Sequence, residues 1–360
     1  MRGIAILMML FYHYTLTING IIQTTLWKII DEGICQTALI AFFVISGFGT
    51  FLSLDYKTEC GESISAFAYL KKRAFSIMPP YYFCIGAILL TTGTGYLTLS
   101  KLKIILAYLL YIQNLFPSIS GDINGVTWTI AVMMQFYLIA VPLYRVLKRF
   151  NIKTYIVVLI FSQILKRIFS FVITKSGYPG LYYVIACIRQ LFTTIDLFTV
   201  GMCAAMLYKQ MKNSGKKISL SRCIYVCILV FITIEVGFVY CIYGVGSMYG
   251  DGFKYLIWEP AIGVLLAVIL FFSAQFPFKY ESYIGRVIQF VAHNEYGTYL
   301  WHMILISNLS SQSGIYSYLQ AKYPILLLLV MMLLACVVGF ISTTLTSSSN
   351  YKAFFIKHLK

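Results

Sequence analysis

Long apolar stretches are the feature that most limits what this chain can fold into. Residues 154–174, 220–242 and 324–346 each reach the length of about 20 residues that a helix needs to cross the hydrocarbon core of a bilayer. Only 11% of the 360 residues are charged and 60% are hydrophobic, whereas soluble domains are about 25% charged. The sequence therefore predicts an all-α, polytopic membrane protein.

Eleven apolar segments predict the order of the helices. They are 3–22, 34–54, 76–94, 104–117, 127–147, 154–174, 187–208, 220–242, 255–274, 295–312 and 324–346. Segment 104–117 is the shortest, and its Pro117 cannot continue a helix. We therefore expect about ten membrane-spanning helices and one re-entrant or interfacial segment.

The basic residues predict the orientation. The formal net charge is +16, but Lys and Arg lie in clusters between the apolar segments, which is typical of cytoplasmic loops and not of a nucleic-acid-binding surface. These clusters fall at 71–73, 145–153, 209–222 and 352–360. All four basic clusters lie on the same side of the membrane only if segment 104–117 does not cross it. Both termini are then cytoplasmic.

The chain shows no repeat, no linker and no signal-peptide cleavage site. We expect one membrane domain, 1–346, followed by a short basic cytoplasmic tail, 347–360, in the plasma (inner) membrane of a bacterium. The nine cysteines include no CxxC pair, and none has a histidine at zinc-ligand spacing. They predict apolar packing, and no metal site is expected.

Two ionisable residues stand out in the first apolar segment. Arg2 and His13 have ten residues between them, so on a helix His13 lies about 16 Å deeper than Arg2. An ionisable ring near the middle of a bilayer is costly unless it faces a protein interior or a water-filled cavity. The position therefore favours a function for His13, and the alternative is a histidine that is merely hydrogen-bonded inside a helix bundle.

Six sequence blocks, taken together and in order, resemble the membrane acyltransferase-3 family. The blocks are RGIAILMMLFYH (2–13), AFFVISGF (41–48), LKKRAFSIMPPYY (70–82), TWTIAVMMQFYL (127–138), FTVGMCAA (198–205) and YGTYLWH (296–302). The resemblance implies an integral-membrane O-acyltransferase (EC 2.3.1-type) that moves an acyl group, acetyl foremost, from acyl-CoA to a carbohydrate or glycolipid hydroxyl. Acetyl-CoA would be the co-substrate, and the membrane lipid is a further partner.

The resemblance also assigns roles to residues. The family's first-helix histidine corresponds to His13, which would serve as the base for the acceptor hydroxyl or as a nucleophile that carries the acyl group. Arg2 corresponds to the family's arginine, and a guanidinium suits the phosphates of coenzyme A. His302 ends its block and is the third catalytic candidate. Arg73 and Lys72 lie in the basic element that would bind the donor. Topological anchoring or packing is the alternative for each.

Two departures from the family pattern affect these roles. A second arginine usually follows the first three residues later, and Ser76 stands there. One or two glutamates usually precede Gln-Phe-Tyr, and here those places hold Met133 and Met134. If that carboxylate orients a catalytic group, another acid must replace it. The candidates are Asp122, Asp196, Glu235 and Glu295.

Three residues are candidates for binding the acceptor. Trp128 and Tyr137 would stack on a sugar, or else belong to the aromatic belt of a membrane protein. Ser46 would donate a hydrogen bond in the active cavity, or else allow close helix packing beside Gly47.

Two other functions fit parts of the pattern. Several spans with buried charges also describe a transporter or flippase for lipid-linked saccharide, although internal repeats are not detectable. The substitutions at Ser76, Met133 and Met134 also fit a catalytically degenerate partner in polysaccharide assembly. Exopolysaccharide, capsule, lipopolysaccharide and wall glycan all remain compatible as acceptors.

Overall fold

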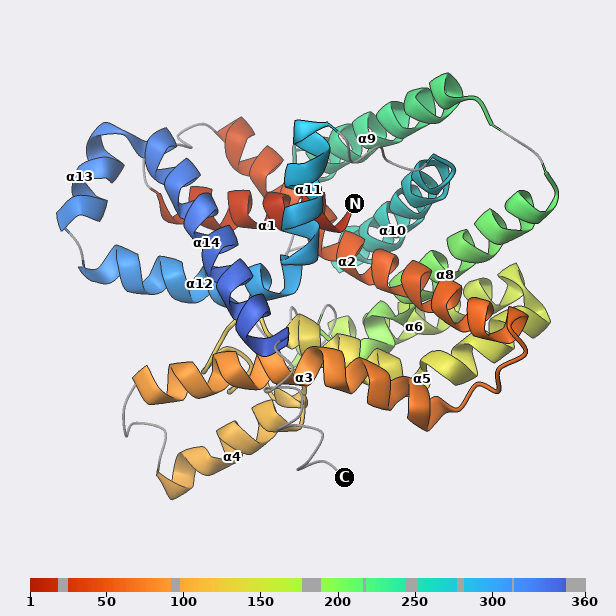
Figure 1. Cartoon of the computed structure of the whole chain (residues 1–360), viewed down its shortest axis with the longest axis horizontal. Helices are drawn as coiled ribbons and strands as arrows, with labels where there is room; N and C mark the ends of the chain where they lie inside the picture. The colour runs from red at the N-terminus through yellow and green to blue at the C-terminus, as the bar shows by residue number, and fades with distance from the viewer. Residues whose placement is uncertain are drawn as a thin grey trace. The chain divides into compact units, whose positions relative to one another are not determined.

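The computed structural model of the chain is all-α across the residues that it describes (Figure 1). These residues are 1–18, 25–91, 98–176, 189–215, 218–243, 252–276, 282–312 and 314–347. They form thirteen α-helices and one short 3-10 helix, and they contain no strand. The prediction of an all-α fold is confirmed.

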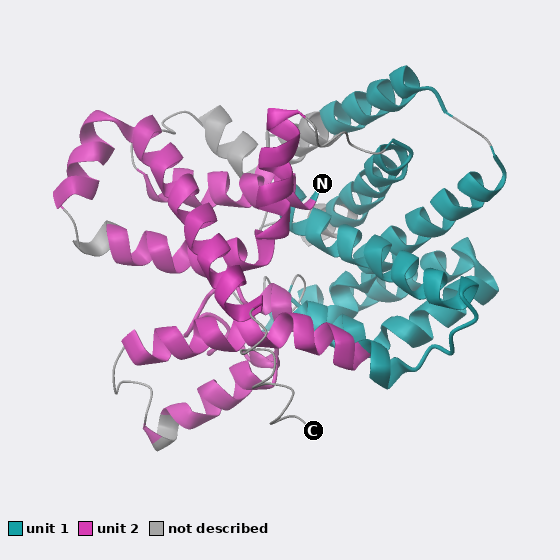
Figure 2. Cartoon of the chain, viewed as in Figure 1, with its two compact units in different colours: residues 1, 36–69, 132–279 teal, residues 2–35, 70–131, 280–360 magenta. Residues whose placement is uncertain are grey.

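Two compact units divide the chain (Figure 2). Unit 1 consists of Met1, Gln36–Tyr69 and Val132–Lys279, and unit 2 consists of Arg2–Cys35, Leu70–Ala131 and Tyr280–Lys360. Three helices therefore contribute residues to both units: α2 (Thr25–Glu59), α3 (Ala66–Thr91) and α5 (Trp128–Phe150). The predicted tail, 347–360, lies beyond the described residues except for Ser347.

Six described helical stretches are long and apolar enough to cross a membrane. They are Thr37–Glu59, Ala66–Thr91, Trp128–Phe150, Ile152–Ile173, Leu191–Asn213 and Pro324–Ser347. Two shorter apolar stretches are Leu220–Thr233 and Trp258–Ala274. A multi-pass membrane protein follows from these lengths, whereas ten crossings and cytoplasmic termini stay predictions.

Segment 104–117 departs from the predicted boundaries. Its helix, α4 (Leu99–Leu109), has 11 residues, which gives a length of about 16 Å against a hydrocarbon core of about 30 Å. The helix ends before Pro117, because Tyr111 takes a left-handed backbone conformation with φ of 57°. The 3-10 helix η2 (Gln113–Leu115) follows, so this segment is too short to cross as one helix.

Unit 1 is built from apolar helices that approach closely. Besides its parts of α2 and α5 it contains α6 (Ile152–Lys175), α8 (Leu191–Asn213), α9 (Leu220–Tyr243) and α10 (Gly252–Ala274). A Cβ atom added at Gly47 would clash with the carbonyl of Phe198, and one at Gly201 would clash with the carbonyl of Val44. These two glycines allow α2 and α8 to touch at their backbones.

Charged residues gather at one end of unit 1 and also inside it. At the end, Asp55 of α2 pairs with Lys148 of α5 (2.9 Å) and Lys209 of α8 (3.6 Å), which joins the C-terminal ends of three helices. Inside, Lys166 of α6 and Glu259 of α10 form a pair at 2.6 Å, with side chains that are 0% and 2% exposed. The buried pair ties α6 to α10.

Unit 2 contains the first and last helices of the described chain. Its helices besides α4 are α1 (Arg2–Thr17), α11 (Tyr283–His293), α12 (Glu295–Gln312), α13 (Gly314–Lys322) and α14 (Pro324–Ser347), together with most of α3. Helix α1 packs against α11, α12 and α14. Pro79 and Pro80 lie inside α3 without ending it, as membrane helices tolerate where neighbouring groups satisfy the freed backbone.

Candidate active site

Helix α1 brings the N-terminal block against α12 and α11. Its buried side chains Ile6, Leu10 and Tyr14 recur every four residues, which is the spacing of one helix face. At Gly3 a Cβ atom would lie 2.8 Å from the carbonyl oxygen of Ile288, so α1 and α11 are in close contact. At the other end of the face, the hydroxyl of Tyr14 donates a hydrogen bond to the carbonyl of His302 at 3.3 Å.

The two catalytic histidine candidates of unit 2 lie side by side. The rings of His13 and His302 have centroids 5.1 Å apart and are tilted by 43°. His302 is 0% exposed, whereas His13 is half-buried. Residues 289 positions apart in the sequence therefore form one pair of imidazole rings, of which His13 is the more accessible.

A backbone hydrogen bond fixes the ring of His302. Its Nδ1 lies 2.7 Å from the carbonyl oxygen of Tyr299, and because a carbonyl only accepts, Nδ1 carries the proton. In the neutral ring, Nε2 then holds the free lone pair. Nε2 is buried and accepts no hydrogen bond from the residues that the structure describes. Nε2 of His302 is thus a buried hydrogen-bond acceptor without a donor among the described residues.

Close backbone packing holds α12 in place. A Cβ atom at Gly297 would clash with the carbonyl of Gly339, and one at Gly339 would clash with the side chain and backbone of Thr298. Helices α12 and α14 therefore touch at these glycines, as small residues permit in membrane helices. His302 lies about one turn along α12 from this close contact between the two helices.

A polar loop before α5 also supports α12, and sequence reasoning missed it. The amide of Asn124 donates to the carbonyl of Leu300 at 3.0 Å. The hydroxyl of Tyr299 donates to the carbonyl of Val126 and lies 2.7 Å from the hydroxyl of Thr129. The sequence signal was present, because polar residues in GDINGVT (121–127) directly precede an apolar helix.

Arg2 begins α1 and pairs with a residue at the start of α12. Its guanidinium lies 3.0 Å from Glu295, and the two side chains are 46% and 15% exposed. Arg2 uses one of its N–H groups here, and a guanidinium has five. Glu295, one of the acids considered as a replacement for the family glutamate, therefore lies at this end of the helix pair and contacts Arg2.

The basic element of α3 lies near this same end of unit 2. The hydroxyl of Tyr296 donates to the carbonyl of Ile77 at 3.0 Å, and Ile77 is one helical turn from Arg73. Arg73 is partly buried, and Lys72 and Ser76 are exposed. The structure thus brings the predicted donor-binding element of α3 to the end of α12 that also holds Glu295.

The three acceptor-binding candidates are all nearly buried. Trp128 is 7% exposed and lies in unit 2, next to the polar loop. Tyr137 and Ser46 are 5% and 4% exposed and lie in unit 1. Ser46 adjoins Gly47, whose contact with α8 supports the alternative of helix packing. A role of these residues in acceptor binding stays a prediction.

The remaining acids lie in different surroundings. Asp122 is exposed in the loop before α5. Asp196 is buried in unit 1, where the charges acting on it are those of Lys166 and Glu259. Nothing is described of the side chain of Glu235.

Met133 is half-buried and Met134 is buried. Within the described ranges, no three His, Cys, Asp or Glu side chains gather as possible metal ligands.

Comparison with known families gives one match over almost the whole chain. A family model described as an acyltransferase domain matches residues 1–347. No curated protein and no solved structure matches the chain. Because the match includes α1, α12 and α14, the histidine pair and its supports lie inside the family domain. The chain is therefore a multi-pass membrane protein that belongs to the acyltransferase-3 family.

Proposed function

We propose that this protein is a membrane O-acyltransferase that moves an acetyl group from acetyl-CoA to a hydroxyl of a cell-surface or lipid-linked carbohydrate. The observation that supports this function is the contact between the His13 and His302 rings, 5.1 Å apart. Ester formation requires a base beside the acceptor hydroxyl, and imidazole serves at neutral pH. Family membership supports the reaction type.

In this mechanism the half-buried His13 contacts the acceptor. Its ring takes the proton of the acceptor hydroxyl as the oxygen attacks the thioester carbonyl. The carbon–sulfur bond then breaks, and the proton passes to the sulfur of coenzyme A, so the products are the acetyl ester and the free thiol. His302 is a positioning residue, because its Nδ1 is tied to Tyr299 while its ring lies against His13.

The donor would bind at the Arg2 end of unit 2. The guanidinium of Arg2 is 46% exposed, so its remaining N–H groups can reach the phosphates of coenzyme A as charge-assisted hydrogen bonds. Arg73 and Lys72 would add positive charge from α3. Helical rise puts His13 about 16 Å from Arg2 along α1, which leaves room for the extended pantetheine arm between phosphate and thioester.

Transfer of labelled acetyl groups tests the proposal. Membranes that contain the wild-type protein, His13→Ala or His293→Ala receive labelled acetyl-CoA, and base-labile label in the carbohydrate fraction is counted. His293 is an exposed histidine at the end of α11, so it controls for loss of a histidine as such. We expect the wild type and His293→Ala to transfer label, and His13→Ala to lose about 10²- to 10⁴-fold.

Three results would contradict the proposal. Full transfer by His13→Ala would remove His13 from the mechanism. Saccharide export without acetyl-CoA consumption by the wild type would favour the transporter, and a deletion phenotype that His13→Ala fully restores would favour a non-catalytic partner.

A further inference from the structure

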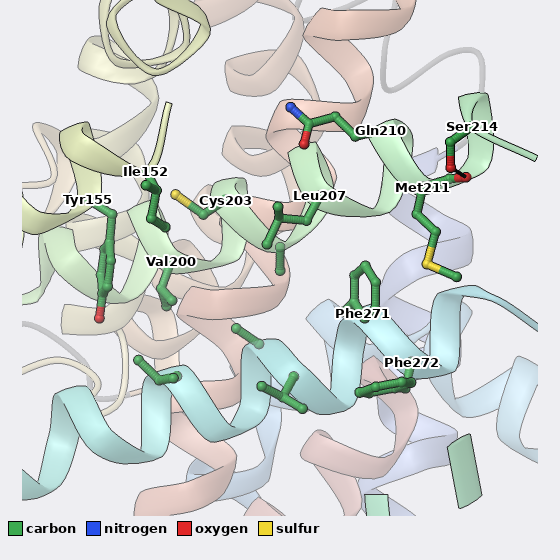
Figure 3. A pocket seen from close by; sticks show the side chains of 14 residues that line it. Ile152, Tyr155, Val200, Cys203, Leu207, Gln210, Met211, Ser214, Phe271 and Phe272 are labelled. Carbon is green, nitrogen blue, oxygen red and sulfur yellow. Dashed lines mark hydrogen bonds between the residues drawn. The ribbon is translucent and has the colours of Figure 1, made fainter. Parts of the chain in front are cut away.

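Two hollows of the described structure differ in the side chains that line them. The larger, of about 560 Å³, lies between α6, α8 and α10 of unit 1 (Figure 3), and its described lining includes no charged residue. The smaller, of about 360 Å³, lies on α11 of unit 2 and is lined by Tyr283, Arg286, Val287 and Phe290. A cation and large apolar side chains therefore meet on one short helix, which the proposed reaction does not use.

The exposed surface of α11 divides into an apolar stripe and a polar stripe. The apolar stripe consists of Tyr283, Ile284, Val287 and Phe290, which are 77%, 69%, 44% and 44% exposed. Their spacing is that of one helix face. The exposed polar residues lie beside this stripe and are Arg286, Gln289 and His293. A helix with two such stripes is suited to the boundary between water and hydrocarbon, with its axis along the membrane plane.

Helix α14, which is long and apolar enough to cross a membrane, has a different exposed surface. From Ile325 to Ile341 all of its exposed residues are apolar, as expected where hydrocarbon surrounds a helix. Helix α11 touches this surface, because the rings of Phe290 and Phe340 have centroids 5.5 Å apart and Phe340 is 44% exposed. Phe340 lies in the last third of α14. The apolar stripe of α11 therefore adjoins the lipid-facing surface of α14 toward its C-terminal end.

The length and the packing of α11 leave its apolar stripe to lipid. The helix has 11 residues, so its length of about 16 Å is too short to cross a hydrocarbon core of about 30 Å. Its inner face is covered by α1, since a Cβ atom at Gly3 would lie 2.8 Å from the carbonyl oxygen of Ile288 and 3.2 Å from the Cβ atom of Ala292. No acidic residue lies within α11, so Arg286 has no partner of opposite charge on its own helix.

We propose that α11 lies in the interface of the membrane, with its apolar stripe among the acyl chains just below the head groups and its polar stripe toward water. The stem of Arg286 would lie along the apolar side chains while its guanidinium reaches the head groups. Because α11 packs against the start of α1, the Arg2 end of α1 would lie at this boundary too. This proposal does not rest on the proposed function, because contact with lipid requires no acyl transfer.

Fluorescence quenching of the full-length protein in phosphatidylcholine nanodiscs tests the proposal. A fluorescent amino acid, introduced by stop-codon suppression, replaces Val287 of the apolar stripe, Gln289 of the polar stripe, or Leu333, which is 65% exposed near the middle of α14. Iodide reports exposure to water, and phospholipids brominated at a shallow or a deep acyl carbon report depth. We expect iodide to quench the label at 289 about threefold more than the label at 287. Shallow bromines should quench position 287 most, and deep bromines position 333.

Each of three other outcomes would overturn the proposal. Equal quenching of positions 287 and 289 by iodide would mean that the two stripes meet the same medium. Strongest quenching of position 287 by deep bromines would place α11 inside the hydrocarbon core. Shielding of position 287 from iodide and from both brominated lipids would mean that a protein partner covers the apolar stripe. If the label at 287 unfolds the protein, a label in place of Tyr283 reports on the same stripe, because Tyr283 is 77% exposed.

Discussion

Each compact unit holds a close pair of ionisable side chains, and the two pairs differ in their charges and in their hydrogen bonds. In unit 1, Lys166 and Glu259 face each other at 2.6 Å as opposite charges. In unit 2, His13 and His302 meet as two rings, without a carboxylate partner among the described residues. The nitrogen Nε2 of His302 lacks a hydrogen-bond partner there.

Under the proposed function, the difference is that between a stabilising contact and a reactive one. Opposite charges in an apolar interior compensate each other, so Lys166 and Glu259 stabilise each other. The histidine pair carries no such compensating charge among the described residues, and in the proposed mechanism its more accessible member, His13, meets the acceptor hydroxyl. The first pair should therefore matter for stability, and the second pair for transfer.

The largest expected effect is on stability, from removing one member of the unit 1 pair. Lys166→Met leaves the carboxylate of Glu259 buried without its cation, which costs about 3–5 kcal/mol for a buried ion pair. The nearby Asp196 adds a second carboxylate to the same site. We expect a large fall in the midpoint of thermal unfolding, measured in detergent.

The double variant Lys166→Met/Glu259→Gln provides the control. Removing both charges together should recover part of the lost stability, because Glu259 no longer carries a buried charge without its cation, and only Asp196 still loses the charge of Lys166. If the single variant unfolded at the wild-type temperature, the pair would not be a stabilising contact, and the contrast between the units would disappear.

The second prediction concerns His302 and its effect on transfer. His302→Leu keeps the volume but removes the hydrogen bond to Tyr299, so the support for His13 is lost. Residues that orient a reactive group typically contribute 10- to 100-fold. We expect a loss of transfer in that range with little change in unfolding temperature.

His302→Asn sharpens the test, because an amide can still donate to the Tyr299 carbonyl and offer an acceptor. If His302 positions His13, the Asn variant should transfer more than the Leu variant, and the pH dependence of transfer should differ from that of the wild type in both. A packing role predicts the reverse order, since Leu fills an apolar site better than Asn.

How far the sequence predicts this molecule depends on the kind of contact. Apolar length and periodicity predicted most of the helices, because a bilayer allows few other solutions. Helix α11 was missed, since its 11 residues are too few to span. The family resemblance identified His13 and His302, but their contact joins two helices far apart in the sequence, and no local pattern encodes it.

Partners of charged residues were the least predictable. The pairing of Arg2 with Glu295 and of Lys166 with Glu259 depends on which helices adjoin, which composition does not determine. A charge inside a predicted span was nevertheless a usable signal: Lys166 lies within segment 154–174, and that position alone called for a buried partner.

A third and smaller effect is expected from the loop that supports α12. Asn124→Ala removes the hydrogen bond to the Leu300 carbonyl, at 3.0 Å. A bond of this type contributes about 1 kcal/mol, and its loss loosens α12 two residues from His302. We expect a slightly lower unfolding temperature and a few-fold lower rate of transfer. Asn213→Ala, at the exposed end of α8, should change neither property.

The smallest effect on stability should come from the Arg2–Glu295 pair, and it distinguishes anchoring from donor binding. The Arg2 side chain is 46% exposed, so its ion pair contributes less than about 1 kcal/mol. Glu295→Gln keeps the size of the side chain and removes its charge, which leaves the guanidinium free for phosphate. If Arg2 binds the donor, this variant should lower the KM for acetyl-CoA, and Arg2→Gln should raise it. An Arg2 that serves only to anchor α1 predicts the same KM in both variants, because neither change would then reach the donor.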